Sequence, residues 1–545
     1  MKIPERKRGS ASFKKDSYTI VLLITCIAAM VFRIPLSYII GDKGMAYFGT
    51  AYELYLLLAG VIGYGLAEAA AILVRYRMKR DQVRSAQKVI SRALMLGFGV
   101  GIVISILTGL LAHVLAEKLF SVPLSGMAVR MISPAIVLYI LTGILRGYFQ
   151  GNGSKIPAMH SLILNTVFLF VGGLAGAVMM HGYGEKVSAL LQNEDYAAAY
   201  GALGAVVGVL IASILCFLHM LILYFLLKGR LKSQMGRELS RNQDTSLQVV
   251  QMLLGTGAIY GVFYLIFDSQ VLLDEVLLYR LSGIAEGLDT LWGIYYGRYQ
   301  VIIGIILGII VLFCLLPVKR IAVLAEHNEY RSAKERLGIL IHQCALLGMP
   351  AAILLAVLSE NLLNAMYKGN NQQVASWIQL GSVGMLFAVF GIVFMDILLK
   401  LKKIKAVLVT AALSLLIHIV TVIILLSGAK SGMQAVVAGN VLFWASMAVA
   451  GFILVSRILQ YRQEWIRSVA FPVVAAAVAG LIAMLLNKAL LSLLGNTASL
   501  IVCLIVAVVL YVVLLIALKD FTEEELEILP GGNLILALAR MLRLM

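Results

Sequence analysis

Charged residues are scarce in this 545-residue chain, because only 13% of its residues are Asp, Glu, Lys or Arg while 61% are hydrophobic. Soluble domains have about a quarter charged residues and about half apolar ones. This composition excludes a soluble globular protein. Apolar runs of about 20 residues, bounded by charge clusters, recur along the whole length. The sequence therefore predicts an all-α polytopic membrane protein with about fourteen transmembrane helices.

Cysteine is also rare, and its five positions share no metal-ligand spacing. All five fall inside apolar runs, and their number is odd. We therefore expect free thiols and neither a disulfide framework nor a metal site. The positions are Cys26, Cys216, Cys314, Cys344 and Cys503.

Acidic residues are outnumbered, with 28 Asp and Glu against 45 Lys and Arg, which gives a net charge of +17. Such a charge could indicate a nucleic-acid partner. The basic residues, however, sit mostly in alternate loops and tails, on the side that includes the N-terminus. The positive-inside rule then predicts a multi-pass protein of the cell membrane with both termini cytoplasmic. We expect contacts with anionic membrane lipids and no nucleic acid.

Catalytic motifs are missing: the chain has no Walker A loop, no HExxH, no GxSxG and no large segment outside the apolar runs. We expect no enzyme activity, no catalytic residue, no cofactor and no metal. A polytopic protein without an enzymatic domain is typically a transporter. Charges inside its helices are then the best indicators of the transport path.

Two opposite charges lie inside the predicted hairpin of residues 31–76. Arg33 falls in the first helix, Glu53 in the second, and a polar turn at 41–44 separates them. Antiparallel helices leave a turn at equal rise, so both residues should lie roughly 12–15 Å below the outer surface and face each other. They either line the transport path or neutralise each other to hold the hairpin, and the two roles are compatible.

A second candidate site is the segment Tyr-Tyr-Gly-Arg-Tyr at 295–299, which we expect near the middle of the eighth helix. A cation beside aromatic rings suits a sugar phosphate, so we group Arg298, Tyr295 and Tyr299 with Arg33 and Glu53 in a central substrate-binding cavity. The alternative is that these tyrosines are interfacial anchors.

Three further residues are candidates for ion coupling or gating: Glu68, Asp396 and His418. Two carboxylates near helix ends could equally reach solvent, and a lone histidine could simply be a hydrogen-bonded core residue. Arg130, near the outer end of the fourth helix, is better explained by snorkelling to the surface.

The basic loops of the two halves recur at an offset of about 245 residues, which is typical of transporters built from two repeats. We therefore expect two six-helix lobes and two additional helices. The predicted parts are a cytoplasmic basic arm (1–16), an N-terminal lobe (17–228), a cytoplasmic linker (229–246), a C-terminal lobe (247–460), helices 13 and 14 (461–519) and a cytoplasmic amphipathic tail (520–545).

Three stretches carry a family resemblance: FRIPLSYIIGDKGMAYFGTAYELYLLL, ILRGYFQGNGSKIPA and FTEEELEILPGG. The chain resembles the polysaccharide-transporter branch of the multidrug/oligosaccharidyl-lipid/polysaccharide (MOP) exporter superfamily, and is similar to its stage V sporulation protein B-type and lipid II flippase-type members. The resemblance implies alternating access and a cationic cavity for the pyrophosphate headgroup of an undecaprenyl-linked saccharide. It also implies a lipid-tail groove at 461–519, and it matches Arg33 to a cavity arginine. The chain departs from the family at Glu53 and Ala67, where prolines are common.

The expected function is therefore a flippase for a lipid-linked saccharide or peptidoglycan precursor, acting as a monomer. One alternative is a cation-coupled multidrug antiporter of the same superfamily, which requires a carboxylate where the first helix has Arg33. A second is a polytopic glycosyltransferase or ligase, which requires an outer loop with catalytic carboxylates. The acidic segment 268–289 is the candidate for such a loop. A scaffold without transport activity is a third, and the buried arginines oppose it.

Overall fold

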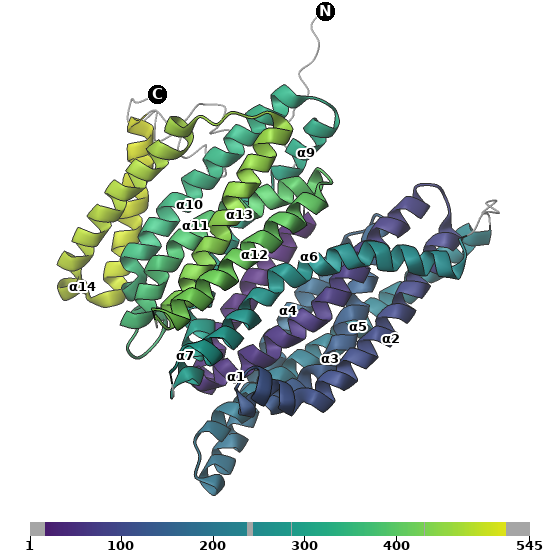
Figure 1. The fold of residues 1–545 in the computed structure, drawn as a ribbon, viewed down its shortest axis with the longest axis horizontal. Helices are drawn as coiled ribbons and strands as arrows, with labels where there is room; N and C mark the ends of the chain where they lie inside the picture. The colour runs from purple at the N-terminus through teal and green to yellow at the C-terminus, as the bar shows by residue number, and fades with distance from the viewer. Residues whose placement is uncertain (1–16, 237–243, 285, 430, 519–545) are drawn as a thin grey trace, which may run out of the picture. The chain divides into compact units, whose positions relative to one another are not determined.

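The computed structural model describes residues 17–236, 244–284, 286–429 and 431–518 (Figure 1), and within them it is helical with no strand. The predicted N-terminal arm (1–16) and the amphipathic tail (520–545) lie outside the described residues. The all-α membrane fold expected from the hydropathy pattern is confirmed.

The helices follow one another with short connections. The first half of the chain contains α1 (Ser17–Met78), α2 (Val83–Val114), the π-helical η2 (Leu115–Leu119), the 3-10 turn η3 (Pro123–Ser125), α3 (Gly126–Gly151), α4 (Ile156–Leu191), α5 (Asp195–Gly236), α6 (Ser246–Leu281) and α7 (Leu288–Ile294). The second half contains the π-helical η4 (Tyr295–Tyr299), α8 (Gln300–Leu315), α9 (Val318–Glu326), α10 (Tyr330–Met366), α11 (Gln372–Lys400), α12 (Ile404–Ser427), α13 (Met433–Leu459), the π-helical η5 (Ile466–Ala470) and α14 (Phe471–Ala517).

Twelve helices in the described residues are long and apolar enough to cross a membrane. Two of these helices, α1 and α14, are each interrupted by one glycine with left-handed backbone geometry, Gly41 at φ 70° and Gly495 at φ 74°. Only glycine adopts this conformation readily, so one residue suffices to separate two arms of a helix. The predicted count of fourteen is therefore approximate, and the expected turn at 41–44 is a break at a single residue.

The helices extend further than hydropathy predicted, because polar residues at their ends continue the helical turn. α2 begins at Val83, so most of the basic stretch expected to form a loop is helical. α6 continues to Leu281, and α7 then begins at Leu288. The acidic segment 268–289 is therefore mostly helix and not the outer loop that we considered as a catalytic candidate.

The chain divides into two compact units, Met1–Gly297 and Arg298–Met545. The boundary falls inside η4, so the adjacent residues Gly297 and Arg298 belong to different units. The lobe boundaries proposed from the sequence, with a linker at 229–246, remain predictions.

In the first unit α1 is central, since it packs against α2, α3, α4, α5, α6 and α7. α4 and α5 form the tightest pair. Their glycines lie backbone to backbone: a Cβ added at Gly176 would come within 2.3 Å of the carbonyl oxygen of Gly204. Close backbone approach through small residues is a common way for helices to associate in membranes.

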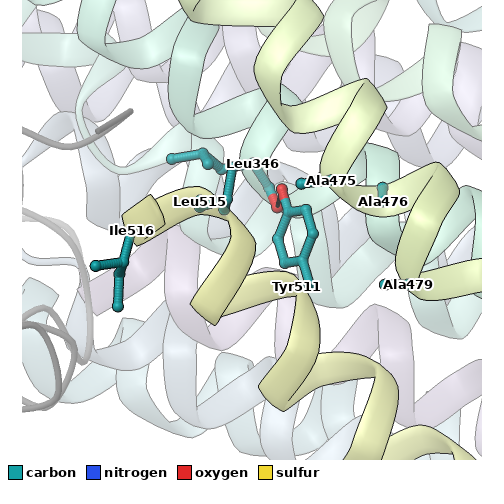
Figure 2. Close-up of a cluster of buried hydrophobic side chains, with 7 residues drawn as sticks. All are labelled: Leu346, Ala475, Ala476, Ala479, Tyr511, Leu515 and Ile516. Carbon is teal, nitrogen blue, oxygen red and sulfur yellow. Dashed lines mark hydrogen bonds between the residues drawn. The ribbon is translucent and has the colours of Figure 1, made fainter. Parts of the chain in front are cut away.

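In the second unit, both arms of α14 pack against α10 (Figure 2). The alanines Ala475, Ala476 and Ala479 let the helices approach, and the Tyr511 hydroxyl donates to the carbonyl oxygen of Leu346 at 3.0 Å. α11 packs against α10, α13 and α8, and α12 covers α13.

Asparagines join α10 to the break in α14. Asn361 Nδ2 donates to Oδ1 of Asn487 at 3.2 Å and of Asn496 at 2.9 Å. Asn496 in turn donates to the Asn361 carbonyl oxygen at 2.8 Å. Hydrogen bonds between side chains of this kind hold membrane helices together at about 1 kcal/mol each.

We predict that Gly176→Ala destabilises the protein, because the added methyl group meets backbone and not a movable side chain. The expected cost is about 1–3 kcal/mol, seen as a lower Tm of the purified protein. Gly182→Ala on the same helix is the control, since a Cβ there meets nothing within 4 Å. Equal melting temperatures for both variants would contradict the packing described for α4 and α5.

Candidate functional site

A buried ion pair connects the two arms of α1. Arg33 Nη2 lies 2.9 Å from Oε1 of Glu53, and the two residues are 5% and 7% exposed. The prediction that these residues face each other across the break at Gly41 is confirmed. Their role in substrate binding remains a prediction.

Tyr296 completes this cluster, although the sequence analysis did not select it. Its hydroxyl donates to Glu53 Oε1 at 2.7 Å, and its ring centre lies 3.9 Å from the Arg33 guanidinium carbon. Gly49 provides the space, since a Cβ there would come within 2.9 Å of the Tyr296 ring. The arginine is therefore stabilised by a carboxylate and by the face of an aromatic ring.

The π-helical winding of η4 explains why Tyr296 and not its neighbours reaches Glu53. A wider turn shifts side-chain directions relative to an α-helix, and such segments are frequent at functional sites. Tyr295 instead stacks on Trp292, with ring centres 5.2 Å apart. Tyr299, also buried, lies in the second unit, where a Cβ at Gly381 would come within 2.2 Å of its hydroxyl.

Arg298 belongs to the second unit and contacts the connection between α10 and α11. Its Nη1 donates to Asn371 Oδ1 at 2.7 Å and to the carbonyl oxygen of Lys368 at 3.4 Å. Its guanidinium carbon lies 5.5 Å from the ring centre of Tyr367. These partners sit at helix ends and not in the middle of a span, so the expected position of Arg298 near mid-membrane needs correction. Its grouping with Arg33 in one cavity remains a prediction.

Further carboxylates surround the cluster within the first unit. Asp274 and Glu275 on α6 are each 1% exposed. The Thr50 hydroxyl donates to Glu275 Oε1, and Oε2 of Glu275 is buried without a hydrogen-bond partner. Glu275 and Asp268 both lie within electrostatic range of Glu53. Acidic groups thus outnumber Arg33 in this part of the unit.

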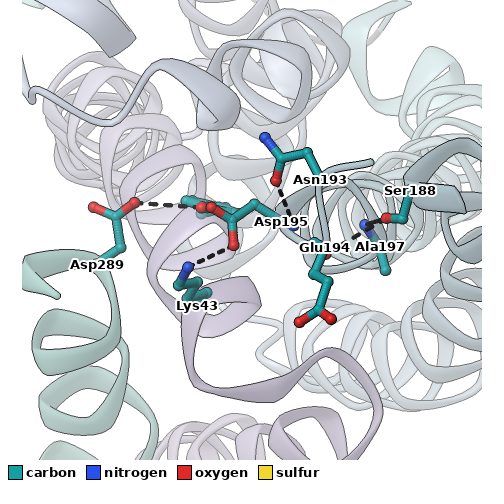
Figure 3. A network of polar contacts seen from close by, with 8 residues as sticks. Lys43, Ser188, Asn193, Glu194, Asp195, Ala197 and Asp289 are labelled. Atoms are coloured by element: carbon teal, nitrogen blue, oxygen red, sulfur yellow. Dashed lines mark hydrogen bonds and ion pairs between the residues drawn. The ribbon is translucent and has the colours of Figure 1, made fainter. Parts of the chain in front are cut away.

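The connection between the arms of α1 is tied to neighbouring helices by polar contacts (Figure 3). Lys43 Nζ lies 2.5 Å from Asp195 Oδ1, and the Asp195 backbone N–H donates to the side chain of Asn193 at 2.9 Å. Asp289 accepts hydrogen bonds from the hydroxyls of Tyr47 and Tyr279 at 3.3 Å and 2.7 Å. These contacts hold the start of α5 and α7 against α1.

The roles proposed for Glu68, Asp396 and His418 in coupling or gating remain predictions, and each residue has its own local surroundings. Glu68 is half-buried on α1 and makes no ion pair within the described part of the chain. Asp396 pairs with Lys400 one turn later on α11. His418 is buried on α12 and packs edge-on against the Phe443 ring, with ring centres 6.3 Å apart.

Within the described ranges, no group of three or more His, Cys, Asp or Glu residues is arranged to hold a metal ion. The five cysteines are free; four are buried and Cys26 is exposed. The site is therefore described by ion pairs, hydrogen bonds and aromatic contacts.

The described residues contain twelve membrane-length helices and several buried charged side chains, as expected of a multi-pass membrane protein. Residues 16–318, more than half of the chain, match the protein family described as "Polysaccharide biosynthesis protein". The chain belongs to this family.

Two relatives at low sequence identity come from Bacillus subtilis (strain 168). Stage V sporulation protein B is 20% identical over 365 residues, 65% of this chain and 66% of the relative. Lipid II flippase MurJ is 23% identical over 203 residues, 35% of this chain and 36% of the relative. The chain thus spans less than two thirds of the length of either relative.

Solved structures share the fold at low identity. Lipid II flippase MurJ in its inward closed conformation gives a TM-score of 0.66 at 13% identity, covering 91% of this chain and 97% of that one. An inward-facing multidrug resistance MATE family transporter of the MOP superfamily gives 0.62 at 14% identity, covering 81% and 99%. This likeness establishes the fold, and both structures are of a flippase or transporter and not of an enzyme.

We predict that breaking the buried pair is costly and that removing both partners is less so. Arg33→Met or Glu53→Leu alone leaves an uncompensated charge and should destabilise the protein by about 3–5 kcal/mol. The double variant should regain much of the lost stability, and a double-mutant cycle of thermal unfolding measures this. Additive losses, or single variants as stable as wild type, would show that the pair is not coupled in the folded protein.

Proposed function

We propose that this protein is a flippase that moves a lipid-linked saccharide of the undecaprenyl pyrophosphate type, or a peptidoglycan precursor, across the cytoplasmic membrane by alternating access. The observation that carries the proposal is the match of residues 16–318 to the polysaccharide biosynthesis family. The fold shared with lipid II flippase MurJ over 91% of the chain supports it.

The Arg33 cluster supplies the chemistry for a pyrophosphate headgroup. A guanidinium binds phosphate oxygens through paired N–H donors and keeps its charge at every physiological pH. A headgroup that enters the cavity would compete with Glu53 for Arg33, and Tyr296 would keep the guanidinium plane oriented. Arg298, Tyr295 and Tyr299 remain candidates for substrate binding in this proposal.

The direction of transport follows from charge and orientation. On the proposed topology both termini are cytoplasmic, since most basic residues lie on the side of the N-terminus. An inside-negative potential favours outward movement of an anionic headgroup by about 2.3 kcal/mol per charge per 100 mV. The residues at 461–519 would accommodate the lipid tail, and Glu68, Asp396 and His418 remain candidates for coupling or gating.

A cation-coupled antiporter is a second candidate, favoured by one specific observation. The first arm of α1 offers Arg33 and no acid, but Glu53, Asp268 and Glu275 gather around it from α1 and α6. A surplus of buried carboxylates suits a cation better than an anion. The glycosyltransferase reading has no comparable support, because its acidic segment is mostly the helix α6.

The test is a flipping assay with the purified full-length chain in lipid vesicles. The probe is a fluorescently labelled undecaprenyl-pyrophosphate-linked saccharide, and dithionite bleaches the label in the outer leaflet. We expect bleaching to continue past the outer-leaflet fraction in vesicles that contain the protein. Bleaching that stops at the level of protein-free vesicles would refute the flippase, and proton-driven ethidium uptake in the same vesicles would identify the antiporter.

We further expect Arg33→Lys to slow flipping about tenfold, the size of one lost charge-assisted hydrogen bond. Arg130→Lys is the matched control, since Arg130 is exposed and donates Nε to the Gly109 carbonyl oxygen at 3.3 Å. Equal flipping rates for wild type and Arg33→Lys would remove Arg33 from the proposed headgroup site.

A further inference from the structure

Arg146 is a second arginine inside the first unit, at the opposite end from the break in α1. It lies on α3, five residues before the helix ends at Gly151, within the membrane-length span Pro123–Gly151. On the proposed topology this end faces the cytoplasm. The Arg146 side chain is half-buried, so part of it is accessible.

All hydrogen-bond partners of Arg146 are neutral. Its Nε donates to Ser161 Oγ at 2.8 Å, and its Nη2 reaches the Ser161 carbonyl oxygen and the Cys216 sulfur, both at 3.5 Å. Ser161 and Cys216 are 0% and 1% exposed. These contacts fix the guanidinium against α4 and α5 but leave Nη1 without a hydrogen bond to a described residue.

Arg146 makes no ion pair in the described part of the chain, unlike the other arginines buried in this unit. Arg33 is neutralised by Glu53, and Arg77 pairs with Asp244 at the end of α1. Glu68 lies, like Arg146, within electrostatic range of Tyr18, but Glu68 and Arg146 form no ion pair. An arginine in a membrane span without a counter-charge is costly and marks a functional site by default.

Aromatic side chains surround this charge. The phenols of Tyr18, Tyr55 and Tyr139 lie within electrostatic range of Arg146. The rings of Tyr55 and Tyr139 meet edge to face at 5.7 Å, and Tyr52 continues the row at 5.9 Å from Tyr55. A row of tyrosines thus leads from the neighbour of Glu53 to the unpaired guanidinium.

We propose that Arg146 binds the phosphate oxygens of a lipid headgroup that enters from the inner leaflet, with Nη1 as the donor. The inference rests on the proposed function and adds a contact to it: Arg146 receives the anionic headgroup before Arg33, which Glu53 already neutralises. A soluble pyrophosphate offers the same oxygens, so the test separates the two sources.

The experiment measures binding by native mass spectrometry of the full-length protein in detergent with three probes: undecaprenyl pyrophosphate, undecaprenol and inorganic pyrophosphate. Arg146→Gln removes the charge and keeps a donor for Ser161. It should weaken undecaprenyl pyrophosphate binding about tenfold or more and leave undecaprenol binding unchanged. Arg146→Lys should restore part of the affinity, and Arg130→Gln, on the same helix, should match wild type.

Three results would overturn the inference. Arg146→Gln could bind undecaprenyl pyrophosphate as tightly as wild type, or lose affinity for undecaprenol equally, which would indicate a structural role. Inorganic pyrophosphate could bind as tightly as the lipid in an Arg146-dependent way, which would identify a soluble anion as the ligand. The flipping assay distinguishes these failures from failure of the proposed function, because wild type would still flip lipid.

Discussion

The buried ion pair between Arg33 and Glu53 is the constraint on which the first unit depends. A guanidinium in a low-dielectric interior needs a partner within hydrogen-bond distance, and the remaining oxygens and donors need partners too. Here the carboxylate comes from the second arm of the same helix, and Tyr296 contributes a hydroxyl and a ring face. Two arms of α1 and the segment η4 are thereby held in one arrangement.

Charge is distributed unevenly along the interior of this unit. Near Arg33 lie the carboxyl groups of Glu53, Asp268 and Glu275, whereas at the end of α3 Arg146 has only neutral hydrogen-bond partners. Arg33 thus contacts a carboxylate, whereas Arg146 contacts hydroxyl, carbonyl and sulfur groups.

Hydropathy and hairpin geometry were enough to predict the membrane helices and the contact between Arg33 and Glu53. Both predictions depend on the length of the apolar runs, which is read from the sequence, and on the constant rise per residue of a helix. Tyr296 could not be selected over Tyr295 and Tyr299 from the sequence, because a π-helical turn shifts side-chain directions in a way that α-helical periodicity does not indicate. It also placed Glu275 in an outer loop, since buried acids interrupt an apolar pattern just as loop residues do.

The partners of Arg146 could not be predicted from the sequence. It stands near a helix end, where an arginine usually reaches solvent, and its sequence neighbours do not reveal whether a carboxylate lies opposite. Only the contacts with Ser161 on α4 and Cys216 on α5 show that its partners are neutral. Pairing between distant helices is a property of packing, so local sequence patterns do not predict it.

The break at Gly41 has a consequence for how this hairpin tolerates change. One residue separates the arms, so the spacing between positions 33 and 53 contains no loop that could absorb an insertion or a deletion. Each added residue would turn Glu53 about 100° around its helix axis and move it about 1.5 Å along that axis. The length of this stretch is therefore as strongly constrained as the identities of Arg33, Gly41 and Glu53.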